Sequence, residues 1–100
     1  MDLESIELDE LVRVAGGSES QALANLIQHE SGGRTTAKNP HSTAFGLGQL
    51  LYANRVKYLG RANAGTTNYN AQLGAMKHYI SDRYGSASRA WSFWQRHHWY

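Results

Sequence analysis

The carboxyl group best placed for chemistry in this sequence belongs to Glu30, at the end of an apolar helical stripe. At 3.6 residues per turn, positions spaced i, i+3, i+4 and i+7 share one helix face, and this is the spacing of Leu23, Leu26, Ile27 and Glu30. Glutamate is rarely buried without a partner, so its place on the core-facing stripe indicates a functional group. A glutamate that turns out to water at the helix end is the competing interpretation.

The position of Glu30 along its helix also predicts a raised pKa. A Gly-Gly pair at 32–33 suits the left-handed residue that ends a helix, so Glu30 lies near the negative end of the helix dipole. That dipole and partial burial both disfavour the ionised carboxylate. A carboxyl group that stays protonated near neutral pH is what a general acid requires.

Acidic residues are scarce around Glu30. Residues 1–20 hold six of the eight acidic side chains, and beyond them only Glu30 and Asp82 remain against nine of the ten Lys and Arg. Asp82 stands next to Arg83 and is more simply a surface or paired charge. Because ordinary glycosidases use two carboxylates, a glycoside-cleaving enzyme built on this chain would work with one and take its nucleophile from the substrate. The cationic body suits an anionic polymer such as cell wall or nucleic acid, and a solvated basic surface without a partner is the alternative.

Other chemistries lack their motifs. The five histidines include no i, i+4 pair and no HExxH, so no metal site is expected. There is no cysteine, hence no thiolate or disulfide. No G-x-S-x-G, Walker or dinucleotide motif occurs, and no cofactor is expected. No apolar run approaches the ~20 residues of a membrane span, and the acidic N-terminus is unlike a secretory signal.

The elements that would position Glu30 are mainly helical. Apolar periodicity predicts about five helices in the 100 residues, at 3–15, 18–31, 49–59, 68–84 and 87–96. Residues 34–45 lack this periodicity and contain the single proline, so a loop or small hairpin is expected there. Residues 1–17 are interpreted as an acidic N-terminal helix or linker, and residues 18–100 as one domain.

Residues typical of helix ends support these boundaries. Ser18 and Gln21 have the spacing of a capping box. Asn68 or Asn70 is the expected N-cap of the fourth helix, Gly85 is its expected end, and Ser86 is the expected N-cap of the fifth.

Aromatic residues gather near the C-terminus, where the last seventeen residues hold six of the eleven. Trp91 and Trp94 are three apart and would lie on one side of a helix. Aromatic side chains fill cores by default, and they also stack on sugar rings or bases.

Three blocks in order carry a family resemblance. They are residues 30–33 (ESGG), residues 39–49 (NPHSTAFGLGQ), and residues 79–85 (YISDRYG) followed by 90–94 (AWSFW) and a closing Trp-Tyr. In this arrangement the chain resembles the lytic transglycosylases of the goose-type-lysozyme-like group, especially catalytic domains of actinobacteriophage tail tape-measure proteins and wall lysins. The resemblance covers about residues 18–100. It implies a lysozyme-like α-helical fold with a cleft for the glycan of peptidoglycan.

The resemblance also implies a mechanism. Glu30, in the place of the family's catalytic glutamate, would protonate the glycosidic oxygen between N-acetylmuramic acid and N-acetylglucosamine. It would then take the proton from the muramic C6 hydroxyl, which attacks the anomeric carbon and leaves a 1,6-anhydro end, with possible help from the 2-acetamido group. This is the one-carboxyl arrangement that the distribution of acidic residues indicates.

Further residues receive candidate roles from the same resemblance. Gln49 matches the family's substrate-contacting glutamine, Ser31 would support Glu30, and Ser42 matches a loop serine that contacts the sugar. Phe45, in the second block, and Trp91 are the other candidates for substrate contact or support.

The chain departs from the family pattern at two places. Many members have Met where Gly48 stands; here Gly46 and Gly48 flank Leu47 and would allow a close approach of a ligand or of another helix. Many members also carry an Ala-Tyr-Asn block whose Tyr helps place the acid, and the matching stretch here is Ala-Trp-Ser at 90–92. Trp91 or a nearby Tyr would have to replace that Tyr.

The expected function is therefore peptidoglycan cleavage by a phage-encoded lytic transglycosylase. Water in place of the C6 hydroxyl would make it a lysozyme-like muramidase, and an inactive wall-binding or tail structural module is a further alternative. A nucleic-acid binder lacks a recognised motif. Glycan strands are the expected partner, without nucleic acid or membrane, and the isolated domain is expected to be a monomer. The expected location is extracellular or virion-associated.

Overall fold

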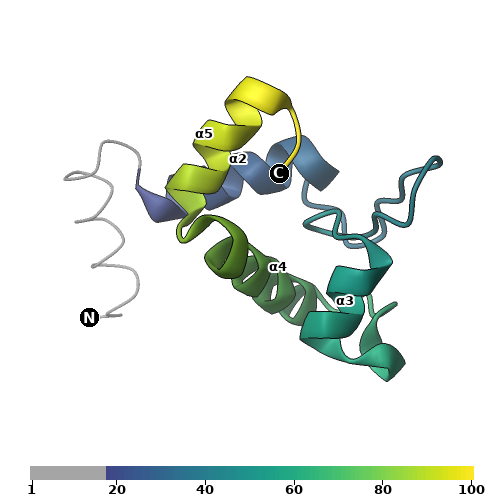
Figure 1. The fold of residues 1–100 in the computed structure, drawn as a ribbon. Helices are drawn as coiled ribbons and strands as arrows, with labels where there is room; N and C mark the ends of the chain where they lie inside the picture. The colour runs from purple at the N-terminus through teal and green to yellow at the C-terminus, as the bar shows by residue number, and fades with distance from the viewer. Residues whose placement is uncertain (1–17) are drawn as a thin grey trace.

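The computed structural model describes residues 18–100, which are mainly α-helical (Figure 1). Four α-helices lie in this part, α2 (Glu19–Ser31), α3 (Tyr52–Leu59), α4 (Tyr69–Tyr84) and α5 (Ala87–His97), with a 3₁₀ turn η1 (Arg61–Asn63). They confirm the mainly α prediction for this stretch. The helix or linker expected at 1–17 lies outside the described residues. None of the helices within 18–100 combines the length and apolar character that a bilayer crossing requires.

Three of the predicted helix ends are confirmed. The side chain of Asn68 accepts a hydrogen bond from the Ala71 N–H at 2.8 Å and begins α4. The Ser86 hydroxyl accepts one from the Arg89 N–H at 3.2 Å and begins α5. Gly85, with φ of 86°, ends α4. Each cap satisfies backbone groups that a helix end otherwise leaves without partners.

Two predictions about helix starts are wrong. Ser18 makes no side-chain cap to α2; its hydroxyl lies 3.3 Å from that of Ser20, and Gln21 donates to Asn25 one turn on. The helix expected from residue 49 begins only at Tyr52. A left-handed residue at 49 (φ 53°) and an antiparallel bridge made by residue 50 hold the preceding segment out of the helix.

The sequence predicted a loop or a small hairpin at 34–45. The segment between α2 and α3 resembles a small hairpin. Its backbone forms two isolated antiparallel bridges, Lys38 with Phe45 and Phe45 with Leu50. Residues 18–100 contain no longer strand. These bridges turn the chain back on itself. The segment that follows α2 and the segment that precedes α3 therefore lie side by side.

The side chain of Gln72 in α4 binds this loop through hydrogen bonds. Its buried amide accepts from the Leu47 N–H at 2.8 Å and donates to the carbonyls of Thr35 and Thr66 at 2.9 and 2.8 Å. Gly46 has φ of 82°, and a Cβ there would lie 2.7 Å from the same amide. One side chain thus joins three loop segments that no sequence periodicity connects.

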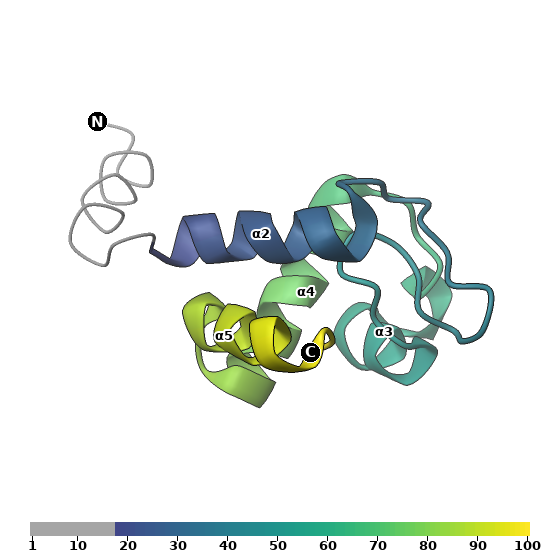
Figure 2. The ribbon, with the colours of Figure 1, turned by 90° about the horizontal axis from the view of Figure 1, so that it is seen from above.

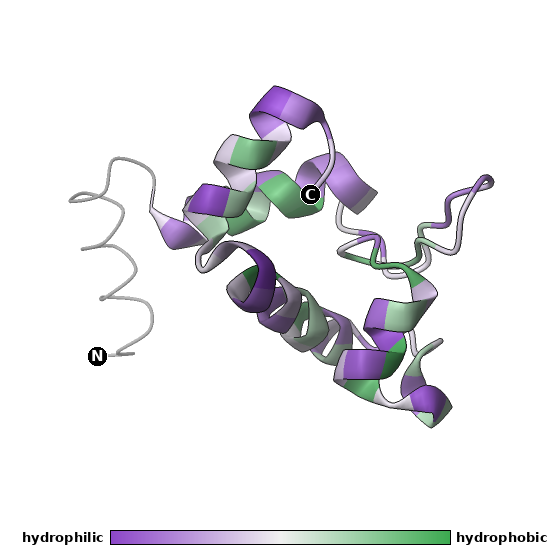
Figure 3. Ribbon diagram, in the orientation of Figure 1, coloured by the Kyte–Doolittle hydropathy of each residue, from purple (hydrophilic) through white to green (hydrophobic). Residues whose placement is uncertain are grey.

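The helices pack in a chain of neighbours around one core. α2 lies along α5, α5 contacts α4, and α4 contacts α3 (Figures 1 and 2). Each helix carries both hydrophobic and hydrophilic residues (Figure 3), and the largest side chains fully excluded from solvent are Leu26, Leu47 and Met76. Leu26 confirms that the predicted apolar stripe of α2 faces the core, which brings Glu30 to the edge of that core.

A carboxylate from α2 also holds the start of α5. Glu19 accepts hydrogen bonds from the Ala87 N–H at 2.5 Å and the Ser88 N–H at 3.1 Å, and from the Ser88 hydroxyl. Burial alone would raise the pKa of Glu19, but these hydrogen bonds outweigh it and the pKa lies below its ordinary value. Together with Ser86, Glu19 occupies the free N–H groups of the first turn, where negative charge is favoured.

Candidate active site

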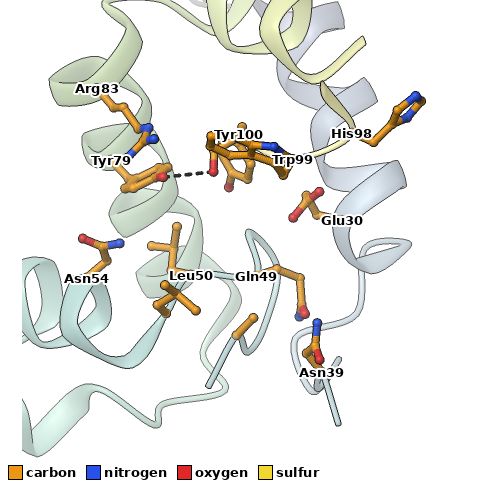
Figure 4. Close-up of a pocket in the computed structure, with 12 residues that line it drawn as sticks. Glu30, Asn39, Gln49, Leu50, Asn54, Tyr79, Arg83, His98, Trp99 and Tyr100 are labelled. Atoms are coloured by element: carbon orange, nitrogen blue, oxygen red, sulfur yellow. Dashed lines mark hydrogen bonds between the residues drawn. The ribbon is translucent and has the colours of Figure 1, made fainter. Parts of the chain in front are cut away.

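The Glu30 side chain lines a cleft of about 530 Å³, which lies between the end of α2, the hairpin loop, α4 and the C-terminal residues. Figure 4 shows Glu30 and Gln49 on one side, Tyr79 and Arg83 of α4 on the other, and Trp99 and Tyr100 between them. The twelve lining residues are Glu30, Asn39, Ala44, Gln49, Leu50, Leu51, Asn54, Tyr79, Arg83, His98, Trp99 and Tyr100. A cleft with one carboxyl group, several amides and aromatic faces suits a neutral polyhydroxyl ligand.

The Glu30 carboxyl is oriented by an indole. Trp94 Nε1–H donates a hydrogen bond of 2.8 Å to Glu30 Oε2. An indole N–H can only donate, so Oε2 must accept whether the carboxyl is ionised or neutral. The proton of the neutral acid therefore sits on Oε1, for which residues 18–100 provide no hydrogen-bond partner. This arrangement leaves one carboxyl oxygen free to give up and receive a proton.

The raised pKa predicted for Glu30 is confirmed in direction. Burial of the carboxyl group raises its pKa above the ordinary value, while the Trp94 hydrogen bond and the nearby His29 lower it by less. Desolvation disfavours the charged form, whereas a donor or a cation favours it. Glu30 thus combines the two properties of a general acid, a raised pKa and an oxygen facing an open cleft.

The Trp94 ring is itself held by other rings. It stacks on Trp91 with centroids 5.4 Å apart and an interplanar angle of 15°. His29 lies 4.7 Å from Trp94 and 5.2 Å from Trp91, and His98 meets Trp94 edge-on at 5.1 Å. These contacts restrict the indole to an orientation in which its N–H points at Glu30.

The other side-chain carboxylates of residues 18–100 are occupied elsewhere. Glu19 binds the start of α5, as described above. Asp82 accepts a 2.6 Å hydrogen bond from the Tyr58 hydroxyl, which raises the pKa of Tyr58 to about 12, and the exposed position of Asp82 confirms the surface-charge alternative. Neither lines the cleft, so Glu30 is the single side-chain carboxylate there among the described residues.

Gln49 is the second sequence-predicted residue that lines the cleft. Its Nε2 donates to the carbonyls of Ala37 and Gly46, each at 2.9 Å, so both amide protons are used within the loop. Only Oε1 remains to meet a ligand, as an acceptor for a hydroxyl or N–H group. Gln49 also has φ of 53°, a conformation that costs about 1–3 kcal/mol in a non-glycine residue and recurs at functional sites.

Four other predicted site residues lie outside the cleft lining. Ser31 is buried and binds backbone only, donating to the Ile27 carbonyl and accepting from the Gly33 N–H, so it supports the turn after Glu30 and not the carboxyl group itself. Ser42 accepts from the Ala44 N–H within the loop. Phe45 lies below Arg55, and Trp91 supports Trp94.

Sequence reasoning missed the residue that orients Glu30 and several residues that line the cleft. Trp91 or a nearby Tyr was expected to help place the Glu30 carboxyl. The residue that contacts this carboxyl is Trp94, one turn beyond Trp91. Trp99 is half exposed in the cleft, and the Tyr79 hydroxyl donates to the Tyr100 carbonyl at 3.0 Å. The concentration of aromatics near the C-terminus was the available signal, but it does not rank one ring above another.

The two glycines around Leu47 meet another helix, one of their two predicted partners. Gly46 faces Gln72, and a Cβ at Gly48 would lie 2.8 Å from both Met76 Cγ and Tyr100 Oη. Tyr100 Oη donates a 2.6 Å hydrogen bond to the Gly48 carbonyl. Met76 and Tyr100 therefore fill the space beside position 48, which accounts for the glycine there.

The described part of the chain, residues 18–100, holds no cluster of three His, Cys, Asp or Glu side chains arranged for a metal ion. No protein-family model, curated protein or solved structure matches the sequence or its fold. The chemistry of the cleft must therefore be argued from its own residues.

Proposed function

We propose that this protein is a peptidoglycan lytic transglycosylase with a lysozyme-like fold. The observation that carries the proposal is Glu30, the single side-chain carboxylate among residues 18–100 that lines the cleft, with a raised pKa and one oxygen held by Trp94. A glycosidase that uses a carboxylate nucleophile needs a second acidic group in the cleft. The other side-chain carboxylates of residues 18–100 bind α5 and Tyr58, which leaves none for this role, and in the proposed reaction the substrate supplies the nucleophile.

In the first step, neutral Glu30 gives its Oε1 proton to the glycosidic oxygen between N-acetylmuramic acid and N-acetylglucosamine. The bond from that oxygen to the muramic anomeric carbon breaks, and the N-acetylglucosamine side leaves as an alcohol. Positive charge develops at the anomeric carbon. The carboxylate that Glu30 becomes, and the substrate's own 2-acetamido group, stabilise this charge.

In the second step, the muramic C6 hydroxyl attacks the anomeric carbon. Its proton passes to the Glu30 carboxylate, which returns to the neutral acid. Glu30 donates one proton in the first step and accepts one in the second, and no water is consumed. The muramic residue ends as a 1,6-anhydro sugar. The Trp94 N–H stabilises the carboxylate between the two steps, and Gln49 Oε1 is the acceptor available to a sugar hydroxyl or acetamido N–H.

The substrate fits the cleft by chemistry. Glycan is neutral along its sugar backbone and presents hydroxyl groups and flat apolar ring faces. The half-exposed Trp99 offers an aromatic face, and Asn39 and Asn54 offer amides. We place the enzyme with the phage tail proteins or wall lysins that the sequence resembles, acting on the wall from a virion or the extracellular side as a monomeric domain without nucleic acid.

The test is mass spectrometry of the soluble products from purified peptidoglycan, with the wild type, Glu30→Gln and Asp82→Asn. The wild type should release muropeptides one water lighter than hydrolytic ones, and Glu30→Gln should release none. Asp82→Asn is the matched control, since it also removes one carboxylate while its side-chain oxygen still accepts from Tyr58. It should retain activity.

Other products would assign another function. Muropeptides that end in reducing muramic acid would make the protein a lysozyme-like muramidase. Release of no product by folded wild type, on walls from several bacterial hosts, would contradict catalysis and favour a wall-binding or tail structural module.

A further inference from the structure

A second groove, of about 460 Å³, lies between α4 and α5 and contains three arginines. Arg83 comes from α4, while Arg89 and Arg96 come from α5 with Ser92 between them, all exposed. The spacing i, i+3 and i+7 places the three α5 residues on one helix face. Among residues 18–100 no Asp or Glu lines this groove, although Glu19 binds its lining residue Ser88, so the lining itself carries three positive charges and no negative one.

Arg83 is fixed in place by aromatic rings. Its guanidinium carbon lies 5.6 Å from the Tyr84 and Trp99 ring centroids and 5.9 Å from that of Tyr79. Its Nε–H donates to the Tyr84 hydroxyl at 3.1 Å. A guanidinium held by stacked rings keeps its other N–H groups in a fixed fork, the geometry that binds a carboxylate.

The arginine groove adjoins the Glu30 cleft at Arg83. Arg83 lines both, and Trp99 contacts Arg83 from within the cleft. Figure 4 shows Arg83 beyond Trp99 and Tyr100 as seen from Glu30. A substituent on a sugar bound at Glu30 could therefore leave the cleft past Arg83 and reach Arg89 and Arg96.

We propose that the arginine groove binds the carboxylates of the peptide stem carried by the muramic acid. This inference rests on the proposed function. The sugar strand is neutral, whereas its stem peptides carry free carboxylates and are covalently fixed to the residue whose bond is cleaved. Tyr84 and Phe93 line the groove beside the arginines and supply apolar contact for stem side chains. The substrate is then peptide-bearing glycan in preference to bare glycan.

The experiment compares kcat/KM on two forms of one peptidoglycan, freed beforehand of attached phosphodiester polymers. One form keeps its stem carboxylates, and in the other they are converted to amides, which preserves the peptides but removes their charge. The wild type should prefer the charged form by about three- to tenfold, since each exposed ion pair is worth up to about fivefold. In Arg89→Gln/Arg96→Gln this preference should fall to about twofold or less, mainly through KM, because only Arg83 remains in the groove.

The matched control is Arg61→Gln/Lys77→Gln, which also removes two exposed positive charges, from outside the cleft and the arginine groove. It should keep the wild-type preference. Raising the salt from 0.05 to 0.5 M should weaken that preference, because the pairs are exposed.

Several results would overturn the inference. One is a wild-type preference near one with normal cleavage of both forms, which would leave the transglycosylase proposal standing. Another is an equal loss of preference in the control. A preference seen only when phosphodiester polymers are retained would assign the groove to those polymers. Retention on duplex DNA that depends on Arg89 and Arg96, without any substrate preference, would assign it to nucleic acid.

Discussion

The contact between Trp94 and Glu30 makes a prediction that separates orientation of the acid from packing around it. Trp94→Phe keeps an aromatic ring on the stack with Trp91 but removes the N–H that binds Oε2. Glu30 should then have a higher pKa, because the lost donor favoured the ionised form. Its carboxyl group should also lose a fixed orientation, so the rate of the chemical step should fall.

The size of the effect follows from the strength of the hydrogen bond. A donor to a charged acceptor is worth about 1.5–3 kcal/mol, and roughly half as much to a neutral one. The ionised carboxyl therefore loses about 1 kcal/mol more than the neutral acid. Loosening the acid should lower kcat about tenfold, since 1.4 kcal/mol on the barrier is a factor of ten. Folding stability should fall by only about 0.5–1.5 kcal/mol.

The assay is the pH profile of kcat/KM for release of anhydro products. Glu30 must be protonated to begin the reaction, so activity declines where it ionises in the free enzyme, and that alkaline decline should move to higher pH in Trp94→Phe. Trp91→Phe is the matched control, because it makes the same change in the stacked neighbour, which makes no hydrogen bond to Glu30. An unchanged alkaline decline in Trp94→Phe, or an equal displacement in Trp91→Phe, would refute the reasoning.

Three further predictions concern stability and are checked by urea unfolding followed by circular dichroism. Gln72→Met should cost about 2–4 kcal/mol, since three buried hydrogen bonds of about 1 kcal/mol each are lost while volume is kept; a cost below 1 kcal/mol would show that the loops do not depend on this amide. Gly48→Ala should cost about 1–3 kcal/mol by overpacking, because its Cβ would meet Met76 and Tyr100 at 2.8 Å, and a neutral effect would contradict that contact. Glu19→Gln should cost about 0.3–1 kcal/mol near neutral pH. The pKa of Glu19 is lower in the folded protein than in the unfolded chain, where it is about 4.3. The stability that Glu19 contributes is therefore complete above the unfolded pKa and is lost as the pH falls through the folded pKa. The difference in unfolding free energy between wild type and variant should disappear in acid and persist in base.

The elements that local chemistry determines were predictable from the sequence. Asn68 and Ser86 begin helices because their side chains cap nearby N–H groups, and Gly85 ends one because it tolerates positive φ. Glu30 was identified because the spacing of apolar residues on α2 places it at the edge of the core. These are interactions within about one helical turn, and residue types at fixed spacing encode them.

The predictions that failed, or that were never made, depend on contacts distant in the chain. Ser18 has the spacing of a capping box, but its φ of 31° is unlike the extended backbone of an N-cap. The bond from Trp94 to Glu30 spans 64 residues, and that from Ala87 to Glu19 spans 68. Which of two tryptophans three residues apart reaches Glu30 depends on the angle between α2 and α5, and no pattern within either helix records that angle.

That angle is itself set by two glutamates of α2. Glu19 binds the N-terminus of α5, and Glu30 accepts from Trp94 toward the other end of the same helix. Eleven residues of helix separate them by about 16 Å, so the two contacts fix both the register and the direction of α5 along α2. A second carboxylate beside Glu30 would raise its pKa further, but it would also place in the cleft a second acidic group that the proposed one-carboxylate reaction does not use. Glu19 uses its charge to position α5 and lies far enough from Glu30 that, among residues 18–100, Glu30 remains the single side-chain carboxylate of the cleft.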